Sequence, residues 1–259
     1  MTEHGRRRRV LRALSTVLIV AGCLILVDAG VTVAWQEPLT AFTTGRTQAG
    51  LQQDLEDLRR RAPTSAEAQA LSDLAAEPSR IAFLSRSLRQ RARAGQAVAR
   101  IRIPRIDLDR VVVQGVDPGS LRKGPGFYDS TPLPGVPGTT AIAGHRTTYG
   151  APFRRIDELR RGDRIVVELP YGTFTYTMER QRIVKPSEVS VLDTVGYDQL
   201  VLSACHPLFS SAERIVVFAR LTGAVGRGSG RGRPLAGPTL SDRVQRPSSA
   251  LKGAATTGR

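Results

Sequence analysis

The chain has 259 residues, a formal net charge of +15 and a hydrophobic fraction of 41%, enough for one large folded domain or two small ones. The charge is concentrated at the two ends, where residues 1–12 carry +4 and residues 223–259 carry +6. Because the centre is only modestly basic and aromatic residues make up just 5% of the chain, this layout argues against nucleic-acid binding and favours a protein close to a membrane.

A long apolar run follows the arginine cluster of residues 1–12. Residues 13–35 are apolar apart from Asp28 and a few small hydroxyl residues. A helix of that length spans the roughly 30 Å of bilayer hydrocarbon, and arginines on its N-terminal side stay in the cytoplasm. We therefore predict a cytoplasmic basic segment over residues 1–12, a single transmembrane anchor over residues 13–35 with Trp35 at the outer interface, and an extracellular remainder.

Two other interpretations of this segment are open. The motif V-A-G-C at residues 20–23 resembles a lipobox, in which Cys23 would carry lipid. A cleavable signal peptide also starts with a basic and then an apolar stretch. The apolar run continues well past Cys23 and is longer than the apolar core of a signal peptide, so the uncleaved anchor is favoured.

Residues 36–97 are rich in Ala, Gln, Leu, Arg and Glu. Leu51, Leu55 and Leu58 have helical spacing, and two prolines interrupt the pattern further on. These features predict a helical stalk or linker of one to three segments. No heptad pattern is sustained, so a coiled coil is not expected.

From residue 98 the sequence consists of short alternating apolar segments separated by Gly- and Pro-rich turns. Seven of them are predicted to be strands: residues 98–104, 110–115, 139–144, 163–169, 172–179, 200–205 and 214–221. One short helix is predicted over residues 152–159, with Phe153, Ile156 and Leu159 on one face.

Seven to eight short strands in this span indicate a mainly β fold, a closed or nearly closed β-barrel over residues 98–222. Residues 223–259 have no apolar periodicity and are predicted to be a disordered basic tail.

Cys205 ends the predicted strand L-V-L-S-A-C. The other cysteine of the chain, Cys23, falls in the predicted membrane segment, so the two cannot form a disulfide. An exported protein with an unpaired thiol is unusual. Cys205 is either a small buried hydrophobe or a reactive nucleophile.

A thiolate nucleophile needs a proton donor for the leaving group and donors for the oxyanion. Of the three histidines, His4 falls in the cytoplasmic segment, and His206 should face away from the thiol because successive strand residues point to opposite faces. His145 can meet Cys205 if their strand ends are neighbours. Arg214 lies beside Cys205 if the last two strands form a hairpin; otherwise it is an ordinary surface arginine.

Other cysteine chemistries fit less well. A phosphatase loop needs an arginine six positions after the cysteine, where the chain has Ser211. A papain-like motif around the cysteine is absent. A zinc site lacks a second external cysteine, and the barrel loops have no dense acidic cluster for calcium. We expect neither a metal nor a cofactor.

Three sequence blocks resemble the signature segments of sortases, and more narrowly of the class E sortases of high-GC Gram-positive bacteria. They are A-G-H-R-T-T-Y-G-A-P-F at 143–153, L-S-A-C-H-P at 202–207 and E-R-I-V-V-F-A at 213–219. W-Q-E-P at 35–38 also resembles that class. The resemblance covers residues 98–222 and the anchor, and implies a sortase-type barrel and a cysteine transpeptidase. Ala204 departs from it, since Thr is common before the cysteine.

The resemblance also implies roles for single residues. Cys205 would attack the carbonyl between Thr and Gly in a sorting signal such as LAXTG or LPXTG on a secreted protein. Arg214 would hold the substrate carbonyl or the oxyanion, and His145 would protonate the departing amine. Tyr149 matches the tyrosine that is linked to a preference for Ala over Pro in the signal. The other residues expected to contact substrate flank the nucleophile: Ser203, Ala204 and His206.

The implied acceptor is an amine of a cell-wall precursor of the lipid II type. Two alternatives are open. A pilus-assembly sortase would use a pilin lysine as the acceptor, and a non-catalytic barrel would bind a sorting peptide or the wall without converting it.

Overall fold

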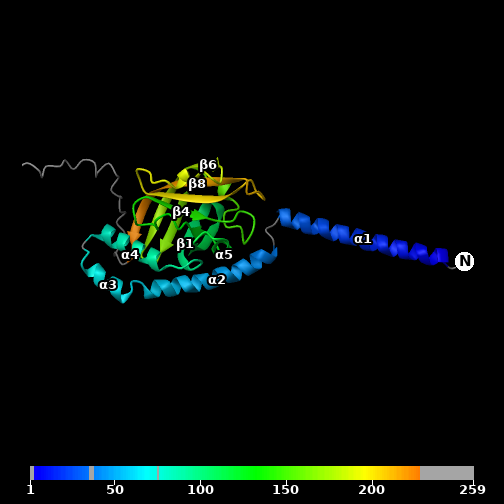
Figure 1. Ribbon diagram of the computed structural model, residues 1–259, viewed down its shortest axis with the longest axis horizontal. Helices are drawn as coiled ribbons and strands as arrows, with labels where there is room; N and C mark the ends of the chain where they lie inside the picture. Colours follow the sequence, from blue (N-terminus) through cyan, green and yellow to red (C-terminus); the bar gives the residue numbers. More distant parts are fainter. Residues whose placement is uncertain (1–2, 35–37, 75, 228–259) are drawn as a thin grey trace, which may run out of the picture.

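The computed structural model describes residues 3–34, 38–74 and 76–227 (Figure 1). The helices are α1 (Glu3–Ala34), α2 (Pro38–Arg61), α3 (Ser65–Ser72), α4 (Glu77–Arg91) and the short α5 (Pro118–Leu121). The strands are β1 (Ala97–Ile103), β2 (Leu108–Gln114), β3 (Gly126–Phe127), β4 (Thr139–Ala143), β5 (Arg164–Leu169), β6 (Gly172–Val184), β7 (Gln199–His206) and β8 (Glu213–Gly226). Three 3-10 segments complete the list: η1 (Pro104–Ile106), η2 (Ile156–Glu158) and η3 (Val189–Leu192). Trp35 and residues 228–259 of the predicted tail lie outside the described residues.

The strands form a closed barrel in the order β1-β2-β3-β4-β7-β8-β6-β5. The β2–β3 and β4–β7 pairs are parallel and all other pairs are antiparallel, with β1 and β5 closing the ring. Closure satisfies the backbone groups that an open sheet would leave at its edges. The prediction of a mainly β chain with a closed barrel of seven to eight strands is confirmed.

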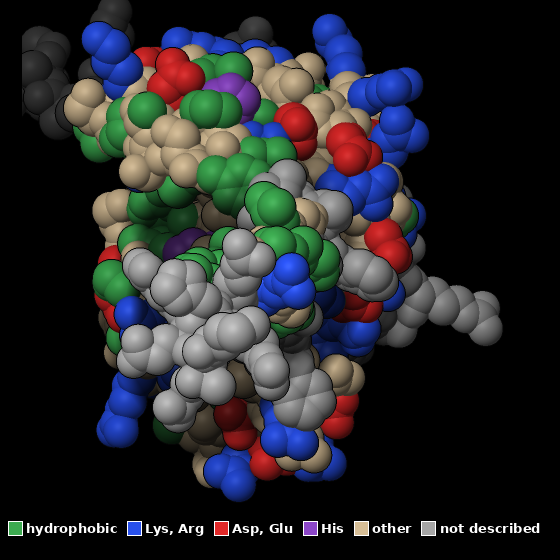
Figure 2. All heavy atoms as spheres, turned by 90° about the vertical axis from the view of Figure 1, so that its right-hand side faces the viewer, with side chains coloured by type: hydrophobic (Ala, Val, Ile, Leu, Met, Phe, Trp, Pro, Cys, Tyr) green, Lys and Arg blue, Asp and Glu red, His purple; other side chains and the backbone are tan. Residues whose placement is uncertain are grey.

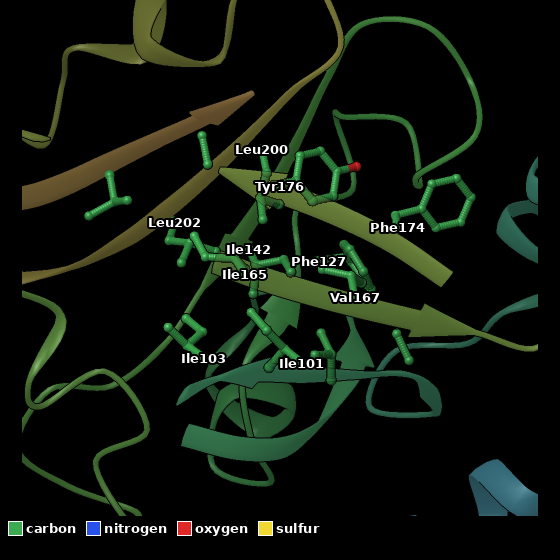
Figure 3. Packing of buried hydrophobic residues seen from close by; sticks show 14 of the residues in the cluster. Ile101, Ile103, Phe127, Ile142, Ile165, Val167, Phe174, Tyr176, Leu200 and Leu202 are labelled. Atoms are coloured by element: carbon green, nitrogen blue, oxygen red, sulfur yellow. The ribbon is translucent and has the colours of Figure 1, made fainter. Parts of the chain in front are cut away.

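Alternation of side chains fills the barrel. In β6, Phe174, Tyr176 and Met178 point inward and are at most 3% exposed, while the residues between them are half-exposed. Ile101, Ile103, Ile165 and Val167 from β1 and β5 meet them in the same core (Figure 3). The interior is therefore packed with apolar side chains, which leaves the outer wall to carry a site.

Some strand boundaries differ from the predicted ones because pairing with distant segments sets the length of the strand. β3 has only two residues and was not predicted. β6 continues past 179 because Arg180 to Val184 pair with the first residues of β8. β8 extends to Gly226, so residues 223–226 of the predicted tail belong to the barrel.

The helix predicted over residues 152–159 is wrong in its form. The segment consists of turns and the three-residue η2, because the Phe153 N–H donates to the carbonyl of His145 at 3.0 Å instead of joining a helix. Its apolar spacing nevertheless has the expected effect, since Phe153, Ile156 and Leu159 are all buried in the barrel core.

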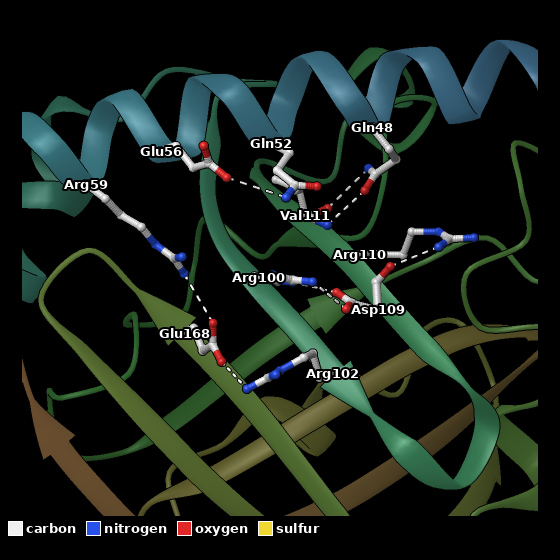
Figure 4. Close-up of polar contacts among 10 residues, drawn as sticks. All are labelled: Gln48, Gln52, Glu56, Arg59, Arg100, Arg102, Asp109, Arg110, Val111 and Glu168. Atoms are coloured by element: carbon white, nitrogen blue, oxygen red, sulfur yellow. Dashed lines mark hydrogen bonds and ion pairs between the residues drawn. The ribbon is translucent and has the colours of Figure 1, made fainter. Parts of the chain in front are cut away.

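The predicted stalk is helical, but it is not a free spacer. Leu51 and Leu55 of α2 pack against Val111 and Val113 of β2. The side-chain amide of Gln48 accepts from the Val111 N–H at 2.8 Å and donates to the carbonyls of Val111 and Lys123 (Figure 4). Arg59 and Arg102 both pair with Glu168, which ties α2 to the barrel wall.

α4 packs against another part of the barrel. Ile81 and Leu88 belong to the main core, and the Ser85 hydroxyl donates to the Leu133 carbonyl at 3.2 Å. Arg89 donates to Gln114 and to the carbonyls of Tyr128 and Thr131. The α2–α4 region is therefore part of the folded domain.

α1 projects away from the barrel as a separate rod (Figure 1). Within it, Leu11–Asp28 is long and apolar enough to cross a membrane by length and composition, and none of that stretch is buried against the rest of the chain.

Candidate active site

The side chains of Cys205 and Arg214 lie directly opposite each other in the antiparallel β7–β8 ladder. Leu202, Ala204 and Ile215 point into the barrel core, so the alternate positions, Cys205 and Arg214 among them, face outward. Directly paired residues have Cβ atoms about 5 Å apart. The hairpin expected from the sequence therefore forms, and it places a thiol beside a guanidinium on the outer wall.

His145 is brought level with Cys205 by the strand on the other side of β7. β4 and β7 run parallel and in constant register, with Ala143 opposite Ser203. His145 comes two residues after Ala143, and Cys205 comes two residues after Ser203, so both residues lie just past the last pair of this parallel ladder. Side chains of the next residues also meet, since Arg146 Nη1 lies 3.0 Å from His206 Nδ1. The two strand ends are thus neighbours, as the sequence argument required.

Glycine permits the tight path of the chain around His145. The N–H of Gly144 donates to the Ser203 carbonyl at 3.0 Å. A Cβ on Gly144 would lie 2.6 Å from the ring of Phe153, closer than packed atoms approach. The chain then passes through Tyr149, Gly150 and Ala151, all with positive φ. This compact turn folds the Tyr149 ring back to 5.0 Å from the His145 ring.

The His145 imidazole lies in a partly desolvated, electropositive setting. Its Nε2 atom is buried and has no hydrogen-bond partner among the described residues. Burial lowers the pKa of His145, and the Arg122 guanidinium lowers it further because two positive charges repel. Arg122 also lies 5.8 Å from the centre of the Tyr149 ring. Both effects disfavour the imidazolium form of His145.

The Arg214 side chain is anchored to the loop that joins β7 to β8. Its Nη1 donates to the carbonyls of Ser211 and Glu213, both at 2.9 Å. In the part of the chain that the structure describes, these bonds use a single nitrogen of the guanidinium. The other N–H groups of the fork are then the ones available to a carbonyl oxygen or an oxyanion.

On the outer face of β7, a polar side chain lies next to Cys205 and apolar side chains follow toward the start of the strand. Ser203 shares the outer face with Cys205, and its hydroxyl is 2.9 Å from the hydroxyl of Tyr128. Further along lies an outer apolar cluster, distinct from the barrel core: Ala141, Val184, Val201, Val216 and Phe218, with Tyr128, Val191 and Leu192 packed against it. β7 is consequently buried on both faces, which explains its nearly continuous apolar sequence.

Two residues expected to contact substrate make other contacts in the structure. The Ala204 side chain is 3% exposed and packs in the barrel core, on the face opposite the thiol. The Nδ1 atom of His206 meets Arg146, which has no acceptor, so Nδ1 is the acceptor. Arg146 also pairs with Asp157 at 2.7 Å. The contact with Arg146 therefore orients the partly exposed His206 ring.

Sequence reasoning missed Tyr128, Arg122 and Arg146. Arg146 lies within the signature block and was not singled out. Tyr128 and Arg122 are separated from the cysteine by more than 70 residues and belong to no motif, so no local signal identifies them.

The arrangement suits acyl transfer. A thiol can form a thioester, a guanidinium can stabilise the negative oxygen of a tetrahedral intermediate, and an imidazole can exchange a proton with an amine. These are the three groups that such a reaction requires.

Comparison with known proteins gives the same picture. The family model described as the sortase domain matches residues 101–222. Sortase D of Bacillus subtilis is 32% identical over 131 residues, which are 49% of this chain and 64% of that protein. Sortase SrtE1 of Streptomyces coelicolor is 33% identical over 153 residues, 53% of this chain and 44% of that protein. The chain thus spans less than two thirds of the length of either relative.

Among solved structures, sortase E1 from Streptomyces coelicolor with a tripeptide in the active site is 30% identical to this chain, with a TM-score of 0.50. The match covers 54% of this chain and 97% of that one. A sortase D5 transpeptidase of Clostridium perfringens, at 23% identity and a TM-score of 0.54, shares the fold. With nearly the whole of a 30% identical sortase matched, the chain belongs to the sortase family of cysteine transpeptidases, as its signature blocks predict.

Proposed function

We propose that this protein is a membrane-anchored sortase that cleaves a C-terminal sorting signal of the LAXTG or LPXTG type between Thr and Gly. It then joins the secreted protein to an amine of a lipid II-type cell-wall precursor. The observation that supports the proposal is the direct pairing of Cys205 with Arg214, with His145 two residues past the end of the parallel β4–β7 pair.

The first half-reaction starts from the fraction of enzyme in which Cys205 is a thiolate and His145 an imidazolium, and the thiolate bonds to the carbonyl carbon of the signal's Thr. The carbonyl oxygen becomes an oxyanion, which Arg214 stabilises through N–H groups that its loop contacts leave available. The C–N bond to Gly then breaks. The departing nitrogen takes a proton from His145 and leaves as an amine, and the thioester remains on the enzyme.

In the second half-reaction the acceptor amine attacks the thioester carbonyl. His145, neutral after the first step, takes a proton from the attacking nitrogen. The C–S bond breaks and the thiolate of Cys205 returns. The desolvated setting that lowers the pKa of His145 favours this base role, because it disfavours the imidazolium form.

The sorting signal would reach Cys205 across the outer surface of the barrel, over the residues that cover β7. The partly exposed groups there are Tyr128, whose hydroxyl lies beside that of the buried Ser203, and Val191 and Leu192 over the outer apolar cluster. Tyr149 is held close to His145, so its ring narrows the space beside the reacting bond. A ring in that place favours Ala over the bulkier Pro in the second position of the signal.

The apolar helix α1 would be the membrane anchor, with the arginine-rich N-terminus in the cytoplasm and the barrel outside. A lipid-linked amine then lies at the same membrane face as the enzyme, and the secreted substrate reaches it there.

The test is acyl-enzyme formation by the full chain in detergent. Incubation with LAXTG and LPXTG peptides and a small amine, followed by intact mass, should give a thioester adduct and an amine-linked product, with faster turnover of the Ala peptide. Cys205→Ala should give neither, whereas the matched control Cys23→Ala should behave as wild type. Peptide binding without any adduct would instead support a non-catalytic barrel.

A further inference from the structure

Exposed apolar side chains gather at one end of the barrel. Outside α1, five large hydrophobic residues in the described chain are substantially exposed: Ile183 at 51%, Val189 at 71%, Leu208 at 37%, Phe209 at 60% and Val225 at 38%. Scattered exposed apolar residues are ordinary. Here, however, Ile183, Leu208 and Phe209 occur near the Cys205 end, and Val225 occurs at the other.

Strand pairing defines these two ends. Ile183 is followed by Val184, which pairs with Arg214, and Leu208 and Phe209 follow Cys205 in the loop between β7 and β8. Val189 begins η3 in the connection that leads from this end of β6 to the start of β7, where Asp193 bonds to Thr139, so it belongs to the side of the barrel. Val225 pairs with Thr173 near the far end of β8, roughly 35 Å along the strand from Arg214 at 3.3 Å per residue. We call Ile183, Leu208 and Phe209 the apolar rim.

The Cys205 end of the barrel is also the end nearest the predicted anchor. Three residues separate Ala34 of α1 from Pro38 of α2, so these Cα atoms are at most about 15 Å apart. Thr44 follows about 9 Å along α2, and it touches Gly150, since a Cβ there would lie 2.8 Å from Thr44 Cγ2. Chain connectivity therefore holds the His145 loop within about 30 Å of the end of α1.

Figure 1 shows the same order of segments. α2 runs from the end of α1 along the barrel, and the loops at that end of the barrel face α1 (Figure 1). Seen from the α1 side, hydrophobic side chains and a histidine border a hollow in the surface (Figure 2).

The setting of Phe209 suits a lipid surface. Its φ is +64°, a conformation costly for a bulky residue, and its side chain is 60% exposed. The guanidinium of Arg154 lies 6.0 Å from the centre of its ring. An aromatic ring beside a cation matches the boundary between anionic headgroups and acyl chains, where one part is buried in lipid and the other is hydrated.

We propose that the apolar rim rests in the headgroup layer of the anionic membrane that holds α1, so that the active site faces the bilayer. The inference rests on the proposed function, in which α1 is an anchor and the acceptor is lipid-linked. It adds a second membrane contact beyond α1, one that fixes the height and tilt of the barrel. The reactive thioester is thereby held at the level of lipid headgroups.

Tryptophan quenching tests this directly, because Trp35 is the single tryptophan of the chain. In the Trp35→Phe background, Phe209→Trp and the matched control Val225→Trp are reconstituted as full-length protein in phosphatidylglycerol-containing vesicles. A series of lipids brominated at different depths is then added. We expect several-fold stronger quenching of the tryptophan at 209 than at 225, with a blue-shifted emission only at 209.

Equal, weak quenching at both positions in protein that floats with the vesicles would overturn the proposal, and so would a failure to float. A spectral change at 209 that needs a sorting peptide instead of lipid would assign the rim to substrate binding and also overturn it. Thioester formation, measured by mass in the same samples, separates the two ideas. A thioester adduct without quenching of the tryptophan at 209 would reject only the membrane contact of the apolar rim. Quenching at 209 without a thioester adduct would reject only the proposed reaction.

Discussion

Cys205 and Arg214 are cross-strand partners in the β7–β8 ladder, at the end where the connecting loop begins. A rigid ladder fixes their relation more tightly than two loops would, because neither Cα can shift without breaking backbone hydrogen bonds. Since the guanidinium is also tied to the carbonyls of Ser211 and Glu213, its orientation is set before substrate arrives.

Arg214→Lys should reduce kcat/KM for a sorting peptide by about 10²-fold or more. Lysine keeps the charge but lacks the planar fork that bonds the loop carbonyls and an oxyanion together. Steady-state kinetics check this. Arg220→Lys on the same strand, where the arginine pairs with Glu179, is the control and should leave the kinetics close to wild type. A similar loss in both variants would mean that the effect is structural.

Arg122→Gln should raise the pKa of His145, because removal of a nearby positive charge makes the imidazolium less unfavourable. Acylation needs protonated His145, so the falling limb of the pH–rate profile should move to higher pH. Titration of the imidazole by NMR measures the shift, which should shrink at high salt because Arg122 is exposed. Arg80→Gln, an exposed arginine on α4, should change neither quantity.

Gly144→Ala should lower both stability and activity. The added methyl would lie 2.6 Å from the Phe153 ring, and overpacking of this kind costs about 1–3 kcal/mol in the free energy of unfolding. His145 follows directly, so activity should fall even at temperatures where the protein stays folded. Gly196→Ala is the control, since nothing lies within 4 Å of its Cβ position. Unchanged activity in folded Gly144→Ala would show that the loop adapts.

Tyr128 and Ser203 should be energetically coupled. Their hydroxyls are 2.9 Å apart in a partly buried setting, and a hydrogen bond of this kind contributes about 1 kcal/mol. Urea unfolding of Tyr128→Phe, Ser203→Ala and the double variant forms a double-mutant cycle, in which the double variant should lose less than the sum of the single losses. Strict additivity would show that the contact contributes nothing.

Leu55→Ala in α2 should destabilise the barrel domain by about 2–5 kcal/mol, because Leu55 is 1% exposed and packs against β2. Asp54→Ala, on the exposed side of the same helix, should stay within about 0.5 kcal/mol of wild type. Thermal unfolding of the two proteins compares them. Equal stability of the Leu55→Ala and Asp54→Ala proteins would mean that α2 does not contribute to the stability of the barrel domain.

Much of the site was predictable because its signals are local. A lone external thiol, a strand that ends at it and an arginine that opens the next strand together predict a reactive hairpin. The alternation of apolar residues predicts the strands, and its repetition predicts a barrel. Ala204 was expected at the substrate surface because it adjoins the nucleophile in sequence, whereas the strand period turns its side chain into the barrel core.

The remainder depends on contacts between distant segments. β3 has two residues and exists only because β2 and β4 offer it partners. Tyr128 reaches Ser203, and Gln48 of α2 binds Val111, across more than 60 residues of chain. No pattern in a short window encodes such pairs, because each is selected by the packing of the whole barrel.

The sequence carries the side-chain chemistry, because it supplies the thiol, the imidazole and the guanidinium and the strand pattern around each. The fold brings these groups together, because Cys205 pairs with Arg214 across the β7–β8 ladder and His145 follows the end of the parallel β4–β7 pair. The fold also makes the helices before the barrel part of the domain, because their apolar faces pack against barrel residues. Side-chain chemistry is a local property, whereas register and burial belong to the fold.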